Sequence, residues 1–179
     1  SNESFFESNN INLLKLRSSF GSTGNSRIGS YGALGLYNID VNANGYNGYN
    51  YANPSTPPNT NLSWERNVKF NAAIDFTFLD NFSTTIEFFR DNITDIITSR
   101  DVIPETGFNS VQINGAEMYN QGVEFSFSAK WFKTKDFSWS TNFNYAKIQN
   151  KVTNLKGLGS EFSGAENARA QRIGFPTSA

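Results

Sequence analysis

The sequence predicts an all-β protein whose antiparallel, up-and-down strands form part of a large transmembrane β-barrel. Apolar and polar residues alternate along several segments, as they do when the two faces of a strand meet different surroundings. The 179-residue chain is polar on average, with a mean hydropathy of −0.48, yet 15% of it is aromatic. This balance is typical of strands that face lipid on one side and a polar lumen on the other. Short and long connections also follow one another in strict order along the chain.

The clearest pattern is a β-hairpin made of residues 121–132 and 137–152. In its first strand the apolar residues share one parity and polar residues take the other, and the pattern resumes after the polar turn 133–136. The apolar positions are Val123, Phe125, Phe127, Ala129 and Trp131, then Phe137, Trp139, Phe143 and Tyr145. Aromatic residues therefore crowd both sides of a tight turn, which is typical of the interface girdle of a membrane barrel.

Three further strands are predicted upstream, over about residues 11–20, 64–78 and 82–100. The connections at 79–81 and 133–136 are short and carry the Asp and Asn residues of tight turns. The connections 21–63 and 101–120 and the segment 155–179 are long, and we expect them to be extracellular loops. Composition alone fits a soluble antiparallel sandwich equally well, but a Greek-key sandwich gives no reason for this strict exchange of short and long connections.

About five strands cannot close a barrel, and an open sheet would leave an apolar face and two edges exposed. We therefore expect the segment to belong to a longer barrel. We also expect Asn120 and Gly122 to bend the chain where a loop re-enters the wall.

Six aromatic residues are predicted to mark the membrane interfaces. With the tight turns on the periplasmic side, all but one lie at the inner interface, and Trp64 lies near the outer rim. They are Trp64, Phe78, Phe82, Trp131, Phe137 and Trp139. Phe89 and Phe132 fall on the opposite parity, which this scheme does not explain.

The composition excludes most catalytic chemistry within this segment. Histidine and cysteine are both absent, which leaves no Ser-His, Cys-His, imidazole-metal or thiolate-metal site. A net charge of −1 gives no electrostatic footprint for nucleic acid. No apolar run approaches the ~18 residues of a membrane helix. We expect no enzyme activity, no metal and no cofactor here.

The segment 42–51 is the candidate for ligand contact. It interleaves tyrosines with asparagines, and flat rings together with amide groups are suited to sugar rings or peptide surfaces. The residues singled out are Tyr46, Asn47, Tyr49, Asn50 and Tyr51. The alternative is that this loop packs on neighbouring loops or on a partner lid.

Several phrases resemble the SusC/RagA-like branch of the TonB-dependent outer-membrane transporters of Bacteroidetes. The longest are LKLRSSFGSTGN at 14–25, NTNLSWE at 59–65 and NGAEMYNQGVE at 114–124. Shorter ones are DFSW at 136–139, NKVT at 150–153 and IGFP at 173–176. Phe20, Thr60 and Gln121 depart from the usual family residues, and they read as tolerated variation.

The resemblance implies a bacterial outer-membrane barrel that imports oligosaccharides or oligopeptides. It further implies a SusD-like surface lipoprotein as lid, outer-membrane lipid around the wall, and TonB as energy source through a plug region absent from these residues. Two other classes stay open at this stage: a non-transporting outer-membrane barrel, such as an adhesin or secretion channel, and a soluble glycan-binding β-sandwich.

Overall fold

The computed structural model describes residues 11–26, 28, 31–40, 49–156, 158, 161–163 and 170–176. These residues fall into two compact units, each assembled from three separate stretches of chain. Unit 1 comprises Ser1–Ser22, Val68–Asn92 and Tyr119–Asn150, and unit 2 comprises Thr23–Asn67, Ile93–Met118 and Lys151–Ala179. Each unit is described by itself below.

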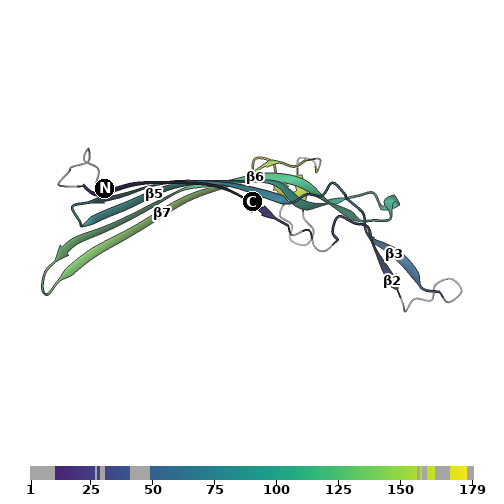
Figure 1. The fold of residues 1–179 in the computed structure, drawn as a ribbon, viewed down its shortest axis with the longest axis horizontal. Coiled ribbons are helices and arrows are strands. Elements are labelled where there is room, and N and C mark those ends of the chain that lie inside the picture. Colours follow the sequence, from purple (N-terminus) through teal and green to yellow (C-terminus); the bar gives the residue numbers. More distant parts are fainter. Residues whose placement is uncertain are drawn as a thin grey trace. The chain divides into compact units, whose positions relative to one another are not determined.

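The main element is a five-stranded antiparallel sheet with the order β1-β4-β5-β6-β7. Figure 1 labels three of its strands, β5, β6 and β7. Its strands are β1 (Ile11–Asn25), β4 (Glu65–Phe78), β5 (Phe82–Asp101), β6 (Ser110–Lys133) and β7 (Ser138–Asn154). From β4 to β7 each strand neighbours the next one along the chain, as in an up-and-down barrel. The predicted antiparallel, up-and-down strands are confirmed.

The three predicted long loops contain more regular structure than the alternation indicated. The first holds β2 (Leu36–Asp40) and β3 (Tyr51–Thr56), which pair antiparallel as a separate sheet. The second holds the 3₁₀ turn η2 (Pro104–Thr106), and the last holds β8 (Glu161–Ser163) paired with β9 (Ala170–Arg172). Pairing within each loop creates these short strands, and a period-two pattern over so few residues does not reveal it.

The boundary expected at residue 120 is wrong, because β6 begins ten residues earlier, at Ser110. The structure also corrects the role of Gly122, which lies inside this strand and is fully buried. A Cβ at Gly122 would sit 2.7 Å from Cε1 of Phe89 and 2.8 Å from the carbonyl oxygen of Lys147. The glycine therefore admits the Phe89 ring and a neighbouring strand, rather than bending the chain. The parity of Phe89 is thereby explained.

Asp95 interrupts the regular backbone geometry of β5. Asp95 has a φ of 58°, in the left-handed region that few non-glycine residues adopt. One such residue shifts the parity of the side chains after it, so a period-two pattern cannot continue through it. The predicted strand 82–100 is thus one strand with an interruption, and its two parts lie in different units.

Few side chains are fully buried. In unit 2 a small core forms from Ala116, Val152 and Leu155, with Ile96 and Leu158 packed against it. Among the described residues no polar or charged side chain is buried. Large apolar side chains instead stay exposed along the strands of both units, as a sheet that is solvated by lipid requires.

None of the helical segments in the described part of the chain has the length and apolar character needed to cross a membrane.

Candidate functional site

The polar face of unit 1 is held together by a charged pair that bridges β1 and β4. Arg17 donates from Nε to Oδ2 of Asp75 at 2.7 Å and from Nη2 to Oδ1 of Asp75 at 2.9 Å. Thr85, on β5, donates its hydroxyl to the same Oδ1 at 2.9 Å. A bidentate guanidinium–carboxylate contact fixes both position and orientation. Three neighbouring strands are therefore joined by side chains on one face.

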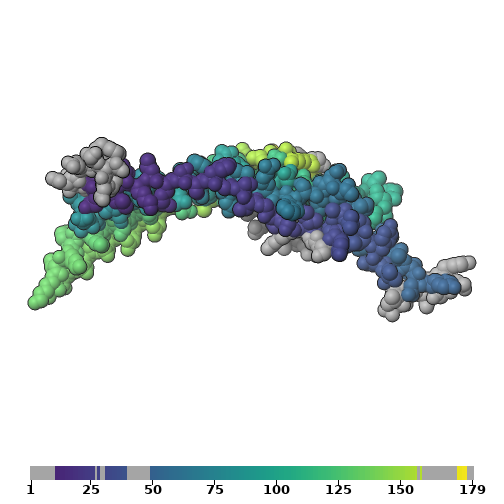
Figure 2. All heavy atoms as spheres, in the orientation of Figure 1, coloured from purple at the N-terminus to yellow at the C-terminus, as the bar shows by residue number. Residues whose placement is uncertain are grey.

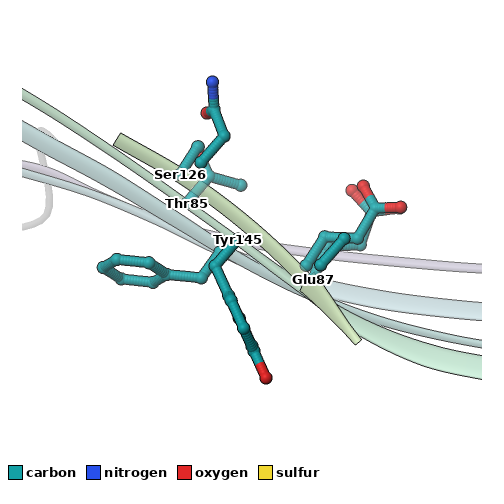
Figure 3. Close-up of a pocket in the computed structure, with 8 residues that line it drawn as sticks. Thr85, Glu87, Ser126 and Tyr145 are labelled. Carbon is teal, nitrogen blue, oxygen red and sulfur yellow. The ribbon is translucent and has the colours of Figure 1, made fainter. Parts of the chain in front are cut away.

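A hollow of about 480 Å³ lies over β5, β6 and β7 beside this network. Its lining residues are Thr85, Glu87, Glu124, Phe125, Ser126, Asn144, Tyr145 and Ala146. Figure 3 shows Thr85, Ser126 and Glu87 on one side of the strands and Tyr145 on the other. Hydroxyl, amide and carboxylate groups thus line one face of the sheet, as on the lumen side of a barrel wall.

The opposite face of unit 1 carries a chain of aromatic contacts that includes four of the six predicted interface residues. Phe78 lies 6.5 Å from Phe82, Phe82 lies 5.4 Å from Trp131, and Trp131 lies 6.5 Å from Trp139, between ring centroids. Trp131 also donates from Nε1 to the Thr141 hydroxyl at 3.1 Å. These rings lie near the two tight turns, which agrees with the predicted membrane interface. Their assignment to that interface stays a prediction.

The other interface candidates are placed separately. Phe137 lies in the turn before β7 and is 60% exposed. Trp64, in unit 2, directly precedes β4 and is 66% exposed, with Cε3 3.6 Å from the position of a Cβ on Gly24. Phe132, the second aromatic without explanation, stacks on Trp139 at 6.1 Å.

Only part of the predicted ligand segment can be placed. Tyr46 and Asn47 lie outside the described residues. Tyr49 and Asn50 precede β3 and are exposed, Tyr49 by 73%. Tyr51 opens β3 opposite Asp40 and is 43% exposed. The placed residues, Tyr49 to Tyr51, are exposed, and ligand contact remains a proposal.

The sequence reading missed the hairpin that carries this segment. Directly opposed residues of an antiparallel pair share a face. Tyr37 pairs with Pro54 and Ile39 with Ala52, so all four lie on one face of the β2–β3 hairpin. Tyr37 and Ile39 are 67% and 66% exposed, which leaves this apolar face open. The usable signal was the alternation of Leu36, Asn38 and Asp40 with Tyr37 and Ile39.

In unit 2 the amides of two asparagines fasten the segment before β4 to the start of β6. The Asn114 Oδ1 accepts the N–H of Ser63 at 2.8 Å, and its Nδ2 donates to the carbonyls of Ser63 at 2.8 Å and Asp95 at 2.7 Å. Asn59 donates from Nδ2 to the carbonyl of Gln112 at 2.7 Å. Both asparagines belong to the phrases quoted above.

The Glu65 side chain connects β1 with the part of β5 that follows Asp95. One carboxylate oxygen accepts the Asn25 amide at 2.7 Å and the other accepts the backbone N–H of Ile97 at 3.0 Å. Ile97 follows the left-handed Asp95 by two residues, and the Glu65 carboxylate accepts its N–H directly. Three residues of the family phrases, Asn59, Asn114 and Glu65, thus form hydrogen bonds with backbone groups of other segments.

Asp95 also belongs to a charged cluster. Nζ of Lys156 lies 2.8 Å from Oδ1 of Asp95 and 2.9 Å from Oε1 of Glu117. Hydrogen bonds to Asp95 first and Glu117 second raise the pKa of the Lys156 ammonium above its ordinary value. Lys156, Asn59, Asn114 and Arg100 line a further hollow of about 490 Å³, together with Pro58, Asn61, Val111 and Ile113.

No group of three or more Asp, Glu, His or Cys side chains that could hold a metal ion occurs within the described ranges. The hydroxyl, amide and carboxylate groups of the two hollows can form hydrogen bonds and charge contacts with a polar solute.

Comparison with known proteins shows which family this chain resembles. A family model described as "TonB dependent receptor-like, beta-barrel" matches residues 9–176. A TonB-dependent receptor of Formosa agariphila is 34% identical over 146 residues, which is 81% of this chain and 14% of the relative. The TonB-dependent receptor SusC of Bacteroides thetaiotaomicron is 32% identical over 191 aligned residues, 97% of this chain and 19% of SusC.

Solved structures show the same similarity in three dimensions. The RagAB peptide transporter matches with a TM-score of 0.81 at 26% identity, covering 98% of this chain and 19% of that one. The RagAB peptide importer in its "open-open" state matches with a TM-score of 0.83 at the same identity and coverage. The chain thus spans less than a fifth of the length of these relatives.

Proposed function

This chain belongs to the TonB-dependent receptor-like β-barrel family, and from that premise we propose that it forms part of the wall of an outer-membrane active transporter. The proposed cargo is an oligosaccharide or an oligopeptide. The transporter would work with a SusD-like lipoprotein as lid and with TonB, which would act through a plug outside these residues. The predicted resemblance to the SusC/RagA-like branch is confirmed by the comparisons.

One observation carries the proposal: the sheet of unit 1 has two chemically different faces. Arg17, Asp75 and Thr85 bond to one another on one face, and Ser126 and Glu87 lie on the same side as Thr85 (Figure 3). The other face presents a row of aromatic rings. Water in a lumen and lipid around the wall are the two surroundings that suit these faces.

The substrate class is proposed from the relatives and from the exposed tyrosines. The structural neighbours are described as a peptide transporter and importer, and SusC is a TonB-dependent receptor. Tyr49 and Tyr51 are exposed at the base of a tyrosine- and asparagine-rich segment. Flat rings beside amide groups suit both a glycan and a peptide backbone.

The apolar face of the β2–β3 hairpin supports a protein partner at the mouth. An isolated two-stranded hairpin is marginally stable in water, and its exposed Tyr37 and Ile39 would be desolvated by a docked surface. The lid lipoprotein is the proposed occupant. The hairpin then contributes lid contact on one face, while the segment that it carries contributes ligand contact.

The two roles can be tested separately in the full-length transporter. Replacing Tyr46, Tyr49 and Tyr51 by Ala should abolish uptake of labelled oligosaccharide or oligopeptide and leave barrel assembly unchanged. Replacing Tyr37 and Ile39 by Ser should instead reduce co-purification of the lid. Unchanged uptake in the first variant would end the ligand assignment, and unchanged lid recovery in the second would end the docking assignment.

A further inference from the structure

A further hollow lies on the aromatic face of unit 1. It measures about 470 Å³ and spans β4, β5 and β6. Its lining residues are Phe76, Phe78, Phe82, Ser83, Thr84, Phe125 and Phe127. Thr84 donates its hydroxyl hydrogen to the Ser126 carbonyl at 2.9 Å, so that donor needs no water. The hollow therefore offers an aliphatic or aromatic guest a surface that is dry and free of charge.

Ring contacts continue from this hollow to the end of the β6–β7 hairpin. Phe76 stacks on Phe78 at 6.3 Å, and Phe82 lies 6.5 Å from Phe127 and 5.4 Å from Trp131. Beyond Trp131 the contacts run on to Trp139, as described above. The hollow is thus one end of a continuous aromatic surface whose other end is the hairpin turn.

Two lysines stand at that turn. Lys133 ends β6 on the parity of Trp131, and Lys135 lies in the turn itself. Both are exposed, and neither forms an ion pair with any residue in the described part of the chain. Figure 2 shows this end of the hairpin, in green, standing clear of the rest of its unit from that side.

The turn that presents the lysines is ordered by its own hydrogen bonds. The backbone N–H of Thr134 donates to the carbonyl of Phe137 at 2.7 Å, and the Thr134 hydroxyl accepts the N–H of Phe137 at 3.0 Å. At the neighbouring turn, the carbonyl of Asn81 accepts the N–H of Lys130 at 2.9 Å. The cations are thus held next to the aromatic surface rather than on a freely moving tail.

We propose that this surface binds one anionic phospholipid of the leaflet at the tight turns. An acyl chain lies in the hollow against Phe78, Phe82 and Phe127, and the phosphate lies between Lys133 and Lys135. The charge complementarity favours an anionic lipid over a second protein, because a dry apolar surface ends in two tryptophans and a turn that is net positive, with Lys133 and Lys135 against Asp136. The inference rests on the proposed function, which places the aromatic face in a bilayer.

Lipid binding to the purified, delipidated full-length transporter tests the site, by native mass spectrometry with phosphatidylglycerol or phosphatidylcholine. Lys133→Gln with Lys135→Gln should weaken phosphatidylglycerol binding about tenfold, because each lysine near a membrane surface attracts anionic lipid independently. Thr84→Phe, which fills the hollow, should weaken binding of both lipids. Lys130→Gln is the matched control, because Lys130 is exposed on the opposite parity of β6, and it should change nothing.

Equal phosphatidylglycerol binding by the wild type and the double lysine variant would overturn the proposal, as would equal wild-type affinity for the two lipids. Displacement of phosphatidylglycerol by inorganic phosphate alone would likewise reduce the site to a phosphate site. Outer-membrane location and uptake are measured in parallel. A wild-type protein that takes up substrate without lipid preference ends only this inference, whereas one absent from the outer membrane ends the proposed function.

Discussion

The side-chain amide of Asn114 makes two hydrogen bonds with the backbone of a single residue, Ser63. It accepts the N–H of Ser63 and donates to its carbonyl, each at 2.8 Å. The amide thereby imitates a strand partner at the point where a long connection approaches the sheet. The backbone of Ser63 is paired although Ser63 itself precedes β4. Few other residues could replace Asn114 here, because few side chains offer a hydrogen-bond donor and an acceptor in one plane.

Asn114→Ala should destabilise this part of unit 2 by about 1–3 kcal/mol, because it leaves the N–H of Ser63 and two carbonyls without partners. Hydrogen exchange at Ser63 should become faster, while exchange in the middle of β6 stays slow. Asn109→Ala is the control, because no hydrogen bond of the exposed Asn109 side chain is recorded among the described residues. Equal exchange at Ser63 in both variants would contradict the role of the amide.

Gly122→Ala should destabilise the barrel wall by about 1–3 kcal/mol through overpacking. The new Cβ would meet Phe89 at 2.7 Å and the Lys147 carbonyl at 2.8 Å, and the latter cannot move without shifting β7. The fraction of folded barrel, read from its mobility on a gel without heating, should fall. Gly21→Ala is the matched control on β1, because a Cβ there meets nothing within 4 Å. Similar folded fractions for the two variants would refute the packing argument.

The contacts of Lys156 with Asp95 and Glu117 should make the stability of this part of unit 2 depend on pH. The folded pKa of Lys156 is raised above 10.5, so its stabilisation is present below that pH and is lost as the pH rises through the raised value. A spin label on Asn154→Cys should therefore gain mobility at strongly alkaline pH. In Lys156→Met the label should be mobile already at pH 8. Lys147→Met, which removes an exposed charge on β7, should leave the profile unchanged.

The side chains of Phe82 and Trp131 should be energetically coupled through their ring contact. A double-mutant cycle with Ala at both positions should give a coupling free energy of about 0.5–1.5 kcal/mol, since the rings lie 5.4 Å apart in an edge-on arrangement. Urea unfolding of the barrel in liposomes measures each variant. The same cycle between Phe82 and Phe137, for which no ring contact is recorded among the described residues, should give a value near zero. A coupling free energy of zero between Phe82 and Trp131 would contradict the idea that the rings form one continuous aromatic surface.

The sequence by itself determined the fold class and the two faces of the wall. Period two is a local property of an extended chain, so Val123, Phe125 and Phe127 reveal their shared face without knowledge of any neighbour. The order of short and long connections is likewise written along the chain. These local signals, with the family phrases, were sufficient to predict strands of a transporter barrel.

Only the tertiary structure decided where that regularity is broken or extended. β6 reaches back to Ser110, and Leu36–Asp40 becomes a strand by pairing with Tyr51–Thr56. Gly122 is required by the ring of Phe89, and Asn114 is required by the backbone of Ser63, each from another part of the chain. Such requirements arise only when distant segments are brought together, because they depend on the space and the unpaired groups that a neighbouring strand presents.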